Sequence, residues 1–299
     1  MPCGAVTSLG SIMVNSQAEG VVAFRVEAEL RCDHVNDPLQ STVYSSHRLA
    51  TVTIARNQWH GWSFPQMKMQ NERYGEMKRI WNTVKELQPL LADSYHDAVD
   101  HVNGFRWLKE NQHDLLIVKS LTSNVLDLLL NGGRVWLMPG ATDLYDPVET
   151  KYLPVFWNYL MFATQPGATM GMYMEKETAL LGAFPHDGSS DWHWYHLVND
   201  TPAICLDTMQ GATPLIEVVD HFHRAKRLAY AFEARAGKGS ILVSTFPFTD
   251  TALMKRPEAA CLFQEMLSYA CGEQFHPESS VTAAELLGVF KLQPIQFTL

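Results

Sequence analysis

The sequence has little charge, few cysteines and no long apolar run, and each shortage excludes a class of protein. Charged residues make up 18% of the 299 residues, against about 25% in typical globular domains. Five cysteines are too few and odd in number for a disulfide framework, and no CxxC pair indicates zinc. No apolar stretch approaches the roughly 20 residues that span a bilayer. We therefore expect no metal site, no cofactor and no membrane-spanning segment.

Positive charge is also in short supply. The 23 Lys and Arg residues are outnumbered by 32 Asp and Glu residues, which gives a net charge of −9. Such a chain repels a phosphate backbone and an anionic membrane surface. The opening residues lack the basic segment and apolar block of a signal peptide. We expect neither a nucleic-acid nor a membrane partner, and the localisation stays open.

The first 66 residues have the pattern of β-strands. Apolar and polar residues alternate over residues 21–30 and again over residues 47–54. A period of two is typical of strands with one wet and one dry face. Three to five strands fit here, fewer than the roughly seven of a complete sandwich. We predict a partial β-sandwich module over residues 1–66, whose exposed strand edges favour a homo-oligomer.

Residues 67–278 show a different pattern, which is typical of an α/β domain. Apolar residues recur at helical spacing from Tyr74 to Leu91. The apolar runs 114–118 and 135–138 flank a helical stretch that ends at Asn131-Gly132-Gly133, as in a βαβ unit. Five further short strands and a helix beginning at Pro257 follow. The pattern predicts a mainly parallel sheet with helices on both faces, and residues 279–299 read as a C-terminal tail that includes a short helix.

One segment stands out as a candidate binding site. Residues 187–196 join a Gly/Ser loop to aromatic rings, carboxylates and histidines, with Trp192, His193 and Trp194 in succession. Trp rings beside Asp and His can hold a sugar, which has an apolar face and a rim of hydroxyl groups. The alternative is an aromatic plug that pins a loop to the sheet. His193, His196, His221 and His223 are read as ordinary histidines rather than metal ligands.

Catalytic motifs are weak. No Ser or Cys occupies the expected strand-to-helix turn, where Pro139-Gly140-Ala141-Thr142 stands. Residues 236–240 lack the leading glycine of a phosphate loop and are read as a turn between strands. Asp187, Asp191 and Glu233 are candidate acid/base carboxylates by residue type only. For Glu233 we expect an ion pair with Arg235 or Lys238.

Several segments together resemble one known pattern. Asn57-Gln58-Trp59-His60-Gly61-Trp62 is similar to the end of a β-sandwich. Later landmarks are Gly132-Gly133-Arg134-Val135-Trp136, Val155-Phe156-Trp157-Asn158, Asp191-Trp192-His193-Trp194 and Phe232-Glu233-Ala234-Arg235. In this order and spacing, over residues 8–278, they resemble the C-terminal region of bacterial, β-galactosidase-like family 2 glycoside hydrolases. The resemblance implies a β-sandwich end followed by a flavodoxin-like, class I amidotransferase-like module, and it adds Trp157 to the candidate ligand-binding residues.

The resemblance implies a carbohydrate-active protein but supplies no catalytic residue. The family's catalytic glutamates lie in an upstream (β/α)8 barrel of about 200 residues or more, for which this chain has no room. Parent proteins of this family are often exported. We expect a non-catalytic accessory module for sugar binding or assembly. The alternatives are a self-contained glycosidase with a carboxylate pair in the α/β domain and an interaction domain without a sugar role.

Overall fold

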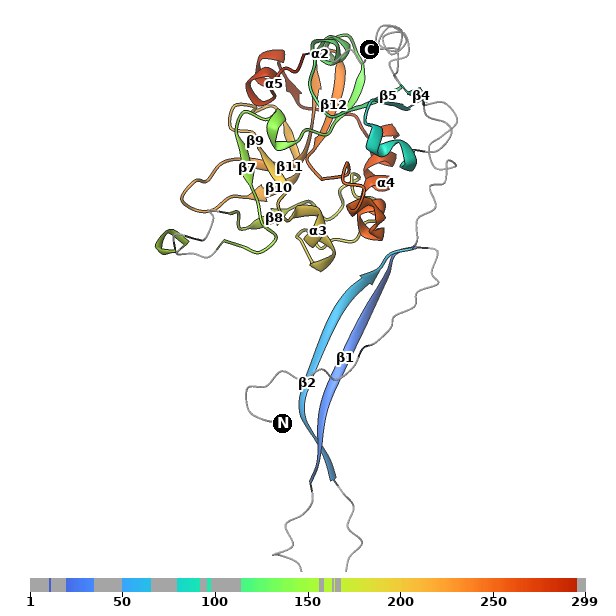
Figure 1. The fold of residues 1–299 in the computed structure, drawn as a ribbon, viewed down its shortest axis with the longest axis vertical. Helices are drawn as coiled ribbons and strands as arrows, with labels where there is room; N and C mark the ends of the chain where they lie inside the picture. Colours follow the sequence, from blue (N-terminus) through green and yellow to red (C-terminus); the bar gives the residue numbers. More distant parts are fainter. Residues whose placement is uncertain are drawn as a thin grey trace, which may run out of the picture. The chain divides into compact units, whose positions relative to one another are not determined.

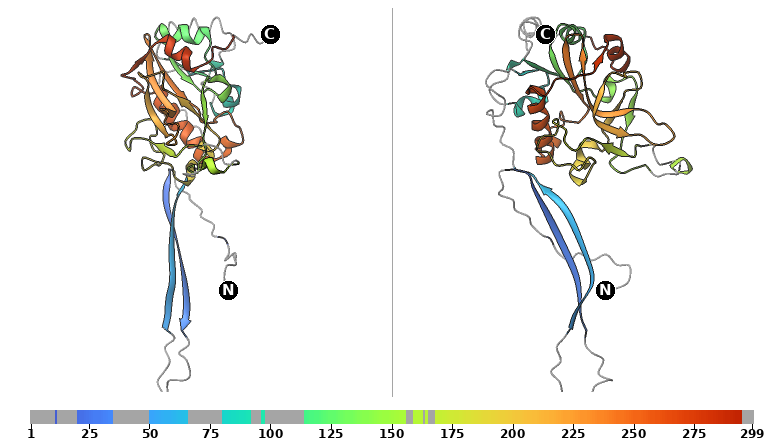
Figure 2. Two further views of the ribbon diagram at one scale, coloured as in Figure 1. Left: turned by 90° about the vertical axis from the view of Figure 1, so that its left-hand side faces the viewer. Right: turned by 180° about the vertical axis from the view of Figure 1, so that it is seen from behind.

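The computed structural model describes residues 11, 20–34, 50–65, 80–91, 96–97, 114–155, 159–162, 164 and 168–294. The chain divides into two compact units, residues 1–65 and residues 66–299. Each unit is described by itself, and Figures 1 and 2 show both.

The first unit is a long two-stranded ribbon. Strands β1 (Val22–His34) and β2 (Ala50–Ser63) pair antiparallel along their whole length, with an irregularity between Leu30 and Arg31. The alternating pattern therefore identified strands correctly. The described residues contain two strands in this unit rather than the expected three to five, and no second sheet that would make a sandwich. Alternation of apolar and polar residues predicts a strand with one apolar and one polar face. It does not predict which segment packs against the apolar face.

The second unit is built on a sheet of eleven strands in the described residues (Figure 1). The main path runs β4-β3-β5-β6-β12-β11-β10-β8, and β7, β9 and β13 attach through β11 and β9. The strands are β3 (Ile80–Asn82), β4 (His96–Asp97), β5 (Leu115–Val118), β6 (Arg134–Leu137), β7 (Pro147–Glu149), β8 (Gly171–Tyr173), β9 (Pro202–Cys205), β10 (Thr213–Val219), β11 (Leu228–Ala236), β12 (Gly239–Ser244) and β13 (Ser280–Val281).

The sheet is mixed, which corrects the expectation of a mainly parallel one. Strands β4, β3, β5, β6 and β12 run parallel, whereas β12, β11, β10 and β8 are antiparallel neighbours. The reason lies in the connections. Gly237, at φ +60°, and Lys238 alone join β11 to β12, and so short a link cannot make the crossover that parallel strands need.

Helices cover both faces of the sheet. The main α-helices are α2 (Ser123–Leu130), α3 (Tyr195–Val198), α4 (Pro257–Cys271) and α5 (Ala283–Val289). Val135 and Leu137 of β6 share a core with residues of α2 and α5, while Trp136 between them stacks on Phe263 of α4 with ring centroids 5.5 Å apart. Helix α5 is the short helix expected in the last residues, and it packs into the core.

One predicted helix is a strand followed by a 3-10 helix. Ile80–Asn82 form β3, and η2 spans Lys85–Leu90 with Pro89 inside it. The apolar residues at helical spacing, Ile80, Val84, Leu87 and Leu91, are all buried. A strand and a tight turn can bury the same residues that a helix would bury, so the spacing alone could not separate the two. Residues 74–79 lie outside the described residues.

Candidate functional site

A cavity of about 470 Å³ lies where α3, the turn before β9 and the segment after β12 meet. Its lining combines polar side chains with apolar surface and comes from two stretches of chain that lie far apart in the sequence: His196, Asn199, Asp200, Thr201, Pro202, Pro247, Asp250, Ala252, Leu253 and Arg256. Its volume falls within the range of small-molecule sites. We call it the α3 cavity.

Hydrogen bonds to its backbone and side chains fix the conformation of the turn between α3 and β9. Asp200 adopts φ +65°, an uncommon value for a residue other than glycine. Its N–H donates to the Thr150 carbonyl, and its carboxylate pairs with Lys151. Hydrogen bonds to Asp200 and Glu149 raise the pKa of Lys151. Thr201 Oγ1 donates to the Leu197 carbonyl at 2.8 Å. These contacts fix the conformation of Asp200, one of the residues that line the cavity.

The opposite side of the α3 cavity carries Asp250 and Arg256. Asp250 Oδ1 accepts the N–H groups of Ala252 and Leu253 at 2.8 and 3.3 Å, at the start of the 3-10 helix η6 (Leu253–Lys255). Arg256 Nε donates to Glu258 Oε1 at 2.6 Å. The terminal guanidinium nitrogens of Arg256 have no hydrogen-bond partner among the described residues. They remain available to a ligand as donors in a fixed plane.

Three aromatic rings form a cluster that is linked to the cavity through Asn199. Tyr152 contacts Trp192 and Tyr195, with centroid separations of 5.8 and 5.3 Å. Trp192 is 72% exposed. We call these rings the aromatic cluster. Asn199 joins the cluster to the cavity, because its Oδ1 accepts the Tyr152 N–H at 3.3 Å while its side chain lines the cavity. An exposed aromatic surface is therefore linked to a cavity that carries several polar side chains.

Residues 187–196 fit both interpretations, the ligand-binding site and the aromatic plug, at different positions. Trp194 is fully buried and packs edge-on against Phe184 at 4.8 Å, as an aromatic plug does. His193 is hydrogen-bonded through Nε2 to the Pro185 carbonyl at 2.7 Å, and burial lowers its pKa. Trp192 alone of these three turns its ring to solvent. Trp157, the fourth predicted ligand-binding residue, lies outside the described residues.

The three carboxylates proposed from the sequence do not line the α3 cavity. Asp191 caps the 3-10 helix η5 (Trp192–Trp194) by accepting the Trp192 N–H at 2.7 Å. Glu233 lies under α4 and accepts a hydrogen bond from Tyr269, and burial raises its pKa. The expected ion pair of Glu233 is absent from the described contacts, because Arg235 donates to the Glu278 carbonyl instead. Asp187 precedes the turn at Gly188.

Sequence reasoning missed most of the cavity's polar side chains. Asp200, Asp250 and Arg256 belong to no motif, and 50 residues separate the two aspartates in the sequence. The one available signal is the segment Asn199-Asp200-Thr201-Pro202 after the short helix α3. Such residues end a helix in a turn, and a turn can present polar side chains.

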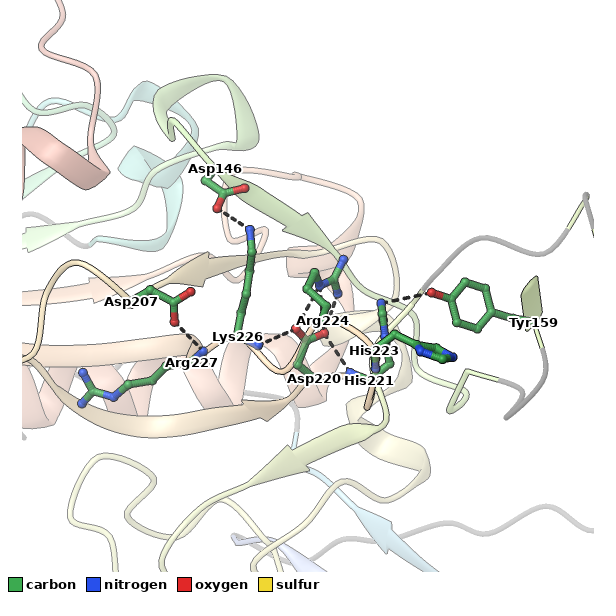
Figure 3. Close-up of polar contacts among 9 residues, drawn as sticks. All are labelled: Asp146, Tyr159, Asp207, Asp220, His221, His223, Arg224, Lys226 and Arg227. Carbon is green, nitrogen blue, oxygen red and sulfur yellow. Dashed lines mark hydrogen bonds and ion pairs between the residues drawn. The ribbon is translucent and has the colours of Figure 1, made fainter.

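A second polar cluster fills the loop between β10 and β11 (Figure 3). The Asp220 side chain is 2% exposed, accepts hydrogen bonds from Arg224 and accepts the backbone N–H groups of His221 and Lys226. Burial raises the pKa of Asp220, but these donors outweigh it and leave the pKa below its ordinary value. Every oxygen is used within the protein, so the cluster serves to hold the loop.

His221 belongs to the same loop and is itself buried. Its Nδ1 accepts the His223 N–H at 3.2 Å, and its Nε2 lies 3.4 Å from the Tyr159 hydroxyl (Figure 3). A neutral ring with Nδ1 as acceptor carries its proton on Nε2. Burial and the nearby Arg224 lower the pKa of His221.

Two further classes of site were sought in the described part of the chain. It contains no group of three or more His, Cys, Asp or Glu residues placed to hold a metal ion. None of its helices combines the length and apolar character required to cross a bilayer.

Comparison with known proteins gives a family without an assigned activity. No curated protein matches the chain. A family model described as a domain of unknown function (DUF8487) matches residues 116–291, which is more than half of the chain. The matched region contains the α3 cavity and the aromatic cluster, whereas the ribbon lies outside it. The chain therefore belongs to the DUF8487 family.

Proposed function

We propose that this protein binds carbohydrate through the α3 cavity and the aromatic cluster, as an accessory module without catalytic activity of its own. The observation that carries the proposal is the junction of the two features at Asn199. A pyranose ring presents an apolar face to an aromatic side chain and hydroxyl groups to polar partners. The cluster supplies the first kind of surface, and the cavity supplies the second.

Each polar group at the cavity suits a hydroxyl-rich ligand. Arg256 offers donors, the carboxylates of Asp200 and Asp250 offer acceptors, and His196 can do either. No sulfur ligand or metal cluster is needed for such binding. The resemblance to the C-terminal region of β-galactosidase-like glycoside hydrolases, which includes a flavodoxin-like module, favours the same ligand class. It also favours an accessory role, because the matched region of that family is not the part that carries its catalytic glutamates.

Calorimetric titration with simple sugars tests the proposal. The panel comprises galactose, glucose, glucuronate and arabinose, with their methyl β-glycosides where these exist. We expect Trp192→Ala and Arg256→Gln each to weaken binding at least tenfold, which is about 1.4 kcal/mol. Tyr173→Ala is the matched control, since Tyr173 is 54% exposed on β8 and lines no part of the site. Binding that Tyr173→Ala weakens as much as Trp192→Ala, or no binding at all, would contradict the proposal.

A self-contained glycosidase is the second candidate, because Asp200 and Asp250 line the same cavity. Glycoside hydrolysis uses two carboxyl groups, about 5–5.5 Å apart for retention or 6.5–9.5 Å for inversion. Hydrolysis of aryl β-galactoside, β-glucoside, β-glucuronide and α-arabinoside distinguishes the candidates. Turnover that Asp250→Asn abolishes, with the circular dichroism spectrum unchanged, would establish this activity. Glu233→Gln and Asp191→Asn should leave any such turnover intact, since neither residue lines the cavity.

A further inference from the structure

The ribbon has one charged face and one apolar face. Residues paired across an antiparallel ribbon lie on the same side, and neighbours along a strand lie on opposite sides. The register pairs Val26 with Trp59 and Leu30 with Ala55 on one side, and Glu29 with Arg56 on the other. The first side carries no charged residue from Val22 to Leu30, and Asn57 and Ser63 are its polar residues there. We call it the apolar ribbon face.

The charged face needs no partner. Arg56 pairs with both Glu27 and Glu29, at 2.7 and 3.4 Å, and Arg25 and Arg31 pair with the same two glutamates. Its charges are neutralised locally and hydrated, so it is suited to water.

Among the described residues of its own unit, nothing covers the apolar ribbon face. Trp59 is 51% exposed and Leu30 is 53% exposed. The Phe24 ring lies over Gly61, where an added Cβ would be 2.6 Å from the ring. The ring therefore fills the space that a side chain at residue 61 would occupy. An isolated two-stranded ribbon is at best marginally stable in water. Covering this face would stabilise it by burying apolar area.

We propose that the apolar ribbon face packs against the same face of a second copy of this chain. Two features favour a second copy. The face has no charge between Val22 and Leu30, so it can meet itself without like-charge repulsion, as a two-fold interface requires. The small residues Ala28 and Ala55 also leave space into which the protruding Trp59 of the other copy can pack. Two ribbons would then form a four-stranded sandwich.

The area suits a weak, reversible dimer. The nine residues from Val22 to Leu30 extend over about 30 Å, and two strands are about 10 Å wide, which gives roughly 300 Å² on each copy. The total of about 600 Å² lies below the standard size of specific interfaces, among weak and transient contacts. The dimer should therefore form in the micromolar range and not as a permanent assembly. Packing through the face differs from pairing through the strand edges, which the sequence pattern first indicated.

Sedimentation velocity of the full chain across the micromolar range tests this proposal. We expect a concentration-dependent equilibrium between monomer and dimer. Trp59→Glu should raise the dimer dissociation constant at least tenfold. Leu30→Gln, a milder change on the same face, should raise it several-fold. The matched control is Thr53→Glu, which places an equal charge on the opposite face, across from Arg31, and should leave the dissociation constant unchanged.

Three outcomes would overturn the proposal. A monomer at every concentration would show that no second copy covers the face. A dimer that Trp59→Glu leaves intact would place the contact elsewhere, for instance at the strand edges. A monomer that sediments with phosphatidylcholine vesicles, and loses this property in Trp59→Glu, would assign the face to lipid. Hydrogen exchange of the ribbon amides in each variant shows whether the ribbon itself is still formed.

Discussion

The ribbon and the central strands of the large sheet both carry large apolar residues, but these residues have opposite surroundings. Val135, Trp136 and Leu137 of β6 are fully buried, whereas Leu30, Ile54 and Trp59 of the ribbon are more than half exposed. Strand β6 lies between two neighbouring strands and has helices on both faces, whereas β1 and β2 have only each other in the described residues. An apolar residue in a strand therefore contributes to stability only in proportion to what covers it.

The large sheet obtains its cover from the chain itself. Helices α2 and α5 bury one face and α4 buries the other. Helix α2 lies in the crossover connection between the parallel strands β5 and β6, which places it on the sheet, and α4 and α5 follow β12 and β13. The described residues of the ribbon unit include no helix. This difference predicts where a substitution is costly.

The largest difference should appear between two tryptophans. Trp136→Ala removes a buried ring that stacks on Phe263 and donates through Nε1 to Ser244 Oγ at 2.9 Å. We expect it to lower the free energy of unfolding by about 3–5 kcal/mol. Trp59→Ala should leave the main urea transition of the monomer unchanged. Equal losses for the two variants would mean that the exposed ribbon ring is packed as tightly as the core ring.

Gly→Ala substitutions in the large sheet and beside the ribbon should also differ in their effect on stability. A Cβ added at Gly239 would lie 2.3 Å from the Gly133 carbonyl oxygen and 2.4 Å from that of Leu129, both on the rigid backbone between α2 and β6. Gly239→Ala should therefore destabilise the sheet by about 1–3 kcal/mol in urea unfolding. Gly20→Ala beside the ribbon meets nothing within 4 Å and should be tolerated. A tolerated Gly239→Ala would contradict the close packing of α2 on the sheet.

The elements that could be predicted from the sequence are those whose apolar pattern matches their burial in the structure. The runs at 114–118 and 135–138 were read as buried strands, and β5 and β6 lie there with helices on both faces. Pro257 predicted the start of α4. Strand β3 was mistaken for a helix because Ile80 and Val84 are buried at a spacing that both structures permit. The exposure of the ribbon's apolar residues could not be predicted, because the sequence of a strand does not show which other segment packs against it.

The candidate site was predictable only where its residues are adjacent in the sequence. Trp192 drew attention because it stands in a cluster of aromatic residues, and its ring is indeed exposed in the aromatic cluster. Asp200 and Arg256 are brought together by the turn before β9 and the segment after β12. No local pattern records that meeting, since it depends on the strand order of the sheet.

Acid should weaken the sheet unit through His221. Burial and Arg224 lower its pKa below the ordinary value of 6.5, although Asp220 opposes them. The unfolded chain then binds a proton more readily than the folded chain, so the free energy of unfolding falls as pH drops below about 6.5. His221→Gln should reduce the loss of stability between pH 7 and pH 5 in urea unfolding, by less than the effect of Gly239→Ala. His60→Gln in the ribbon is the matched control. An unchanged slope in His221→Gln would exclude this histidine as the cause.

The smallest effect is expected at the charged face of the ribbon. The pKa of Glu27 lies below its ordinary value of 4.5, chiefly because Arg56 donates a hydrogen bond to it. Arg56→Gln should let that pKa rise, as carboxyl chemical shifts during an NMR titration would record. The urea transition of the sheet unit should not move, because an exposed ion pair competes with water and is screened by salt. Salt added to the native protein should raise the Glu27 pKa in the same direction. A shifted urea transition in Arg56→Gln would mean that the ribbon and the sheet unfold together. The two regions would then differ in the exposure of their apolar residues but not in their stability.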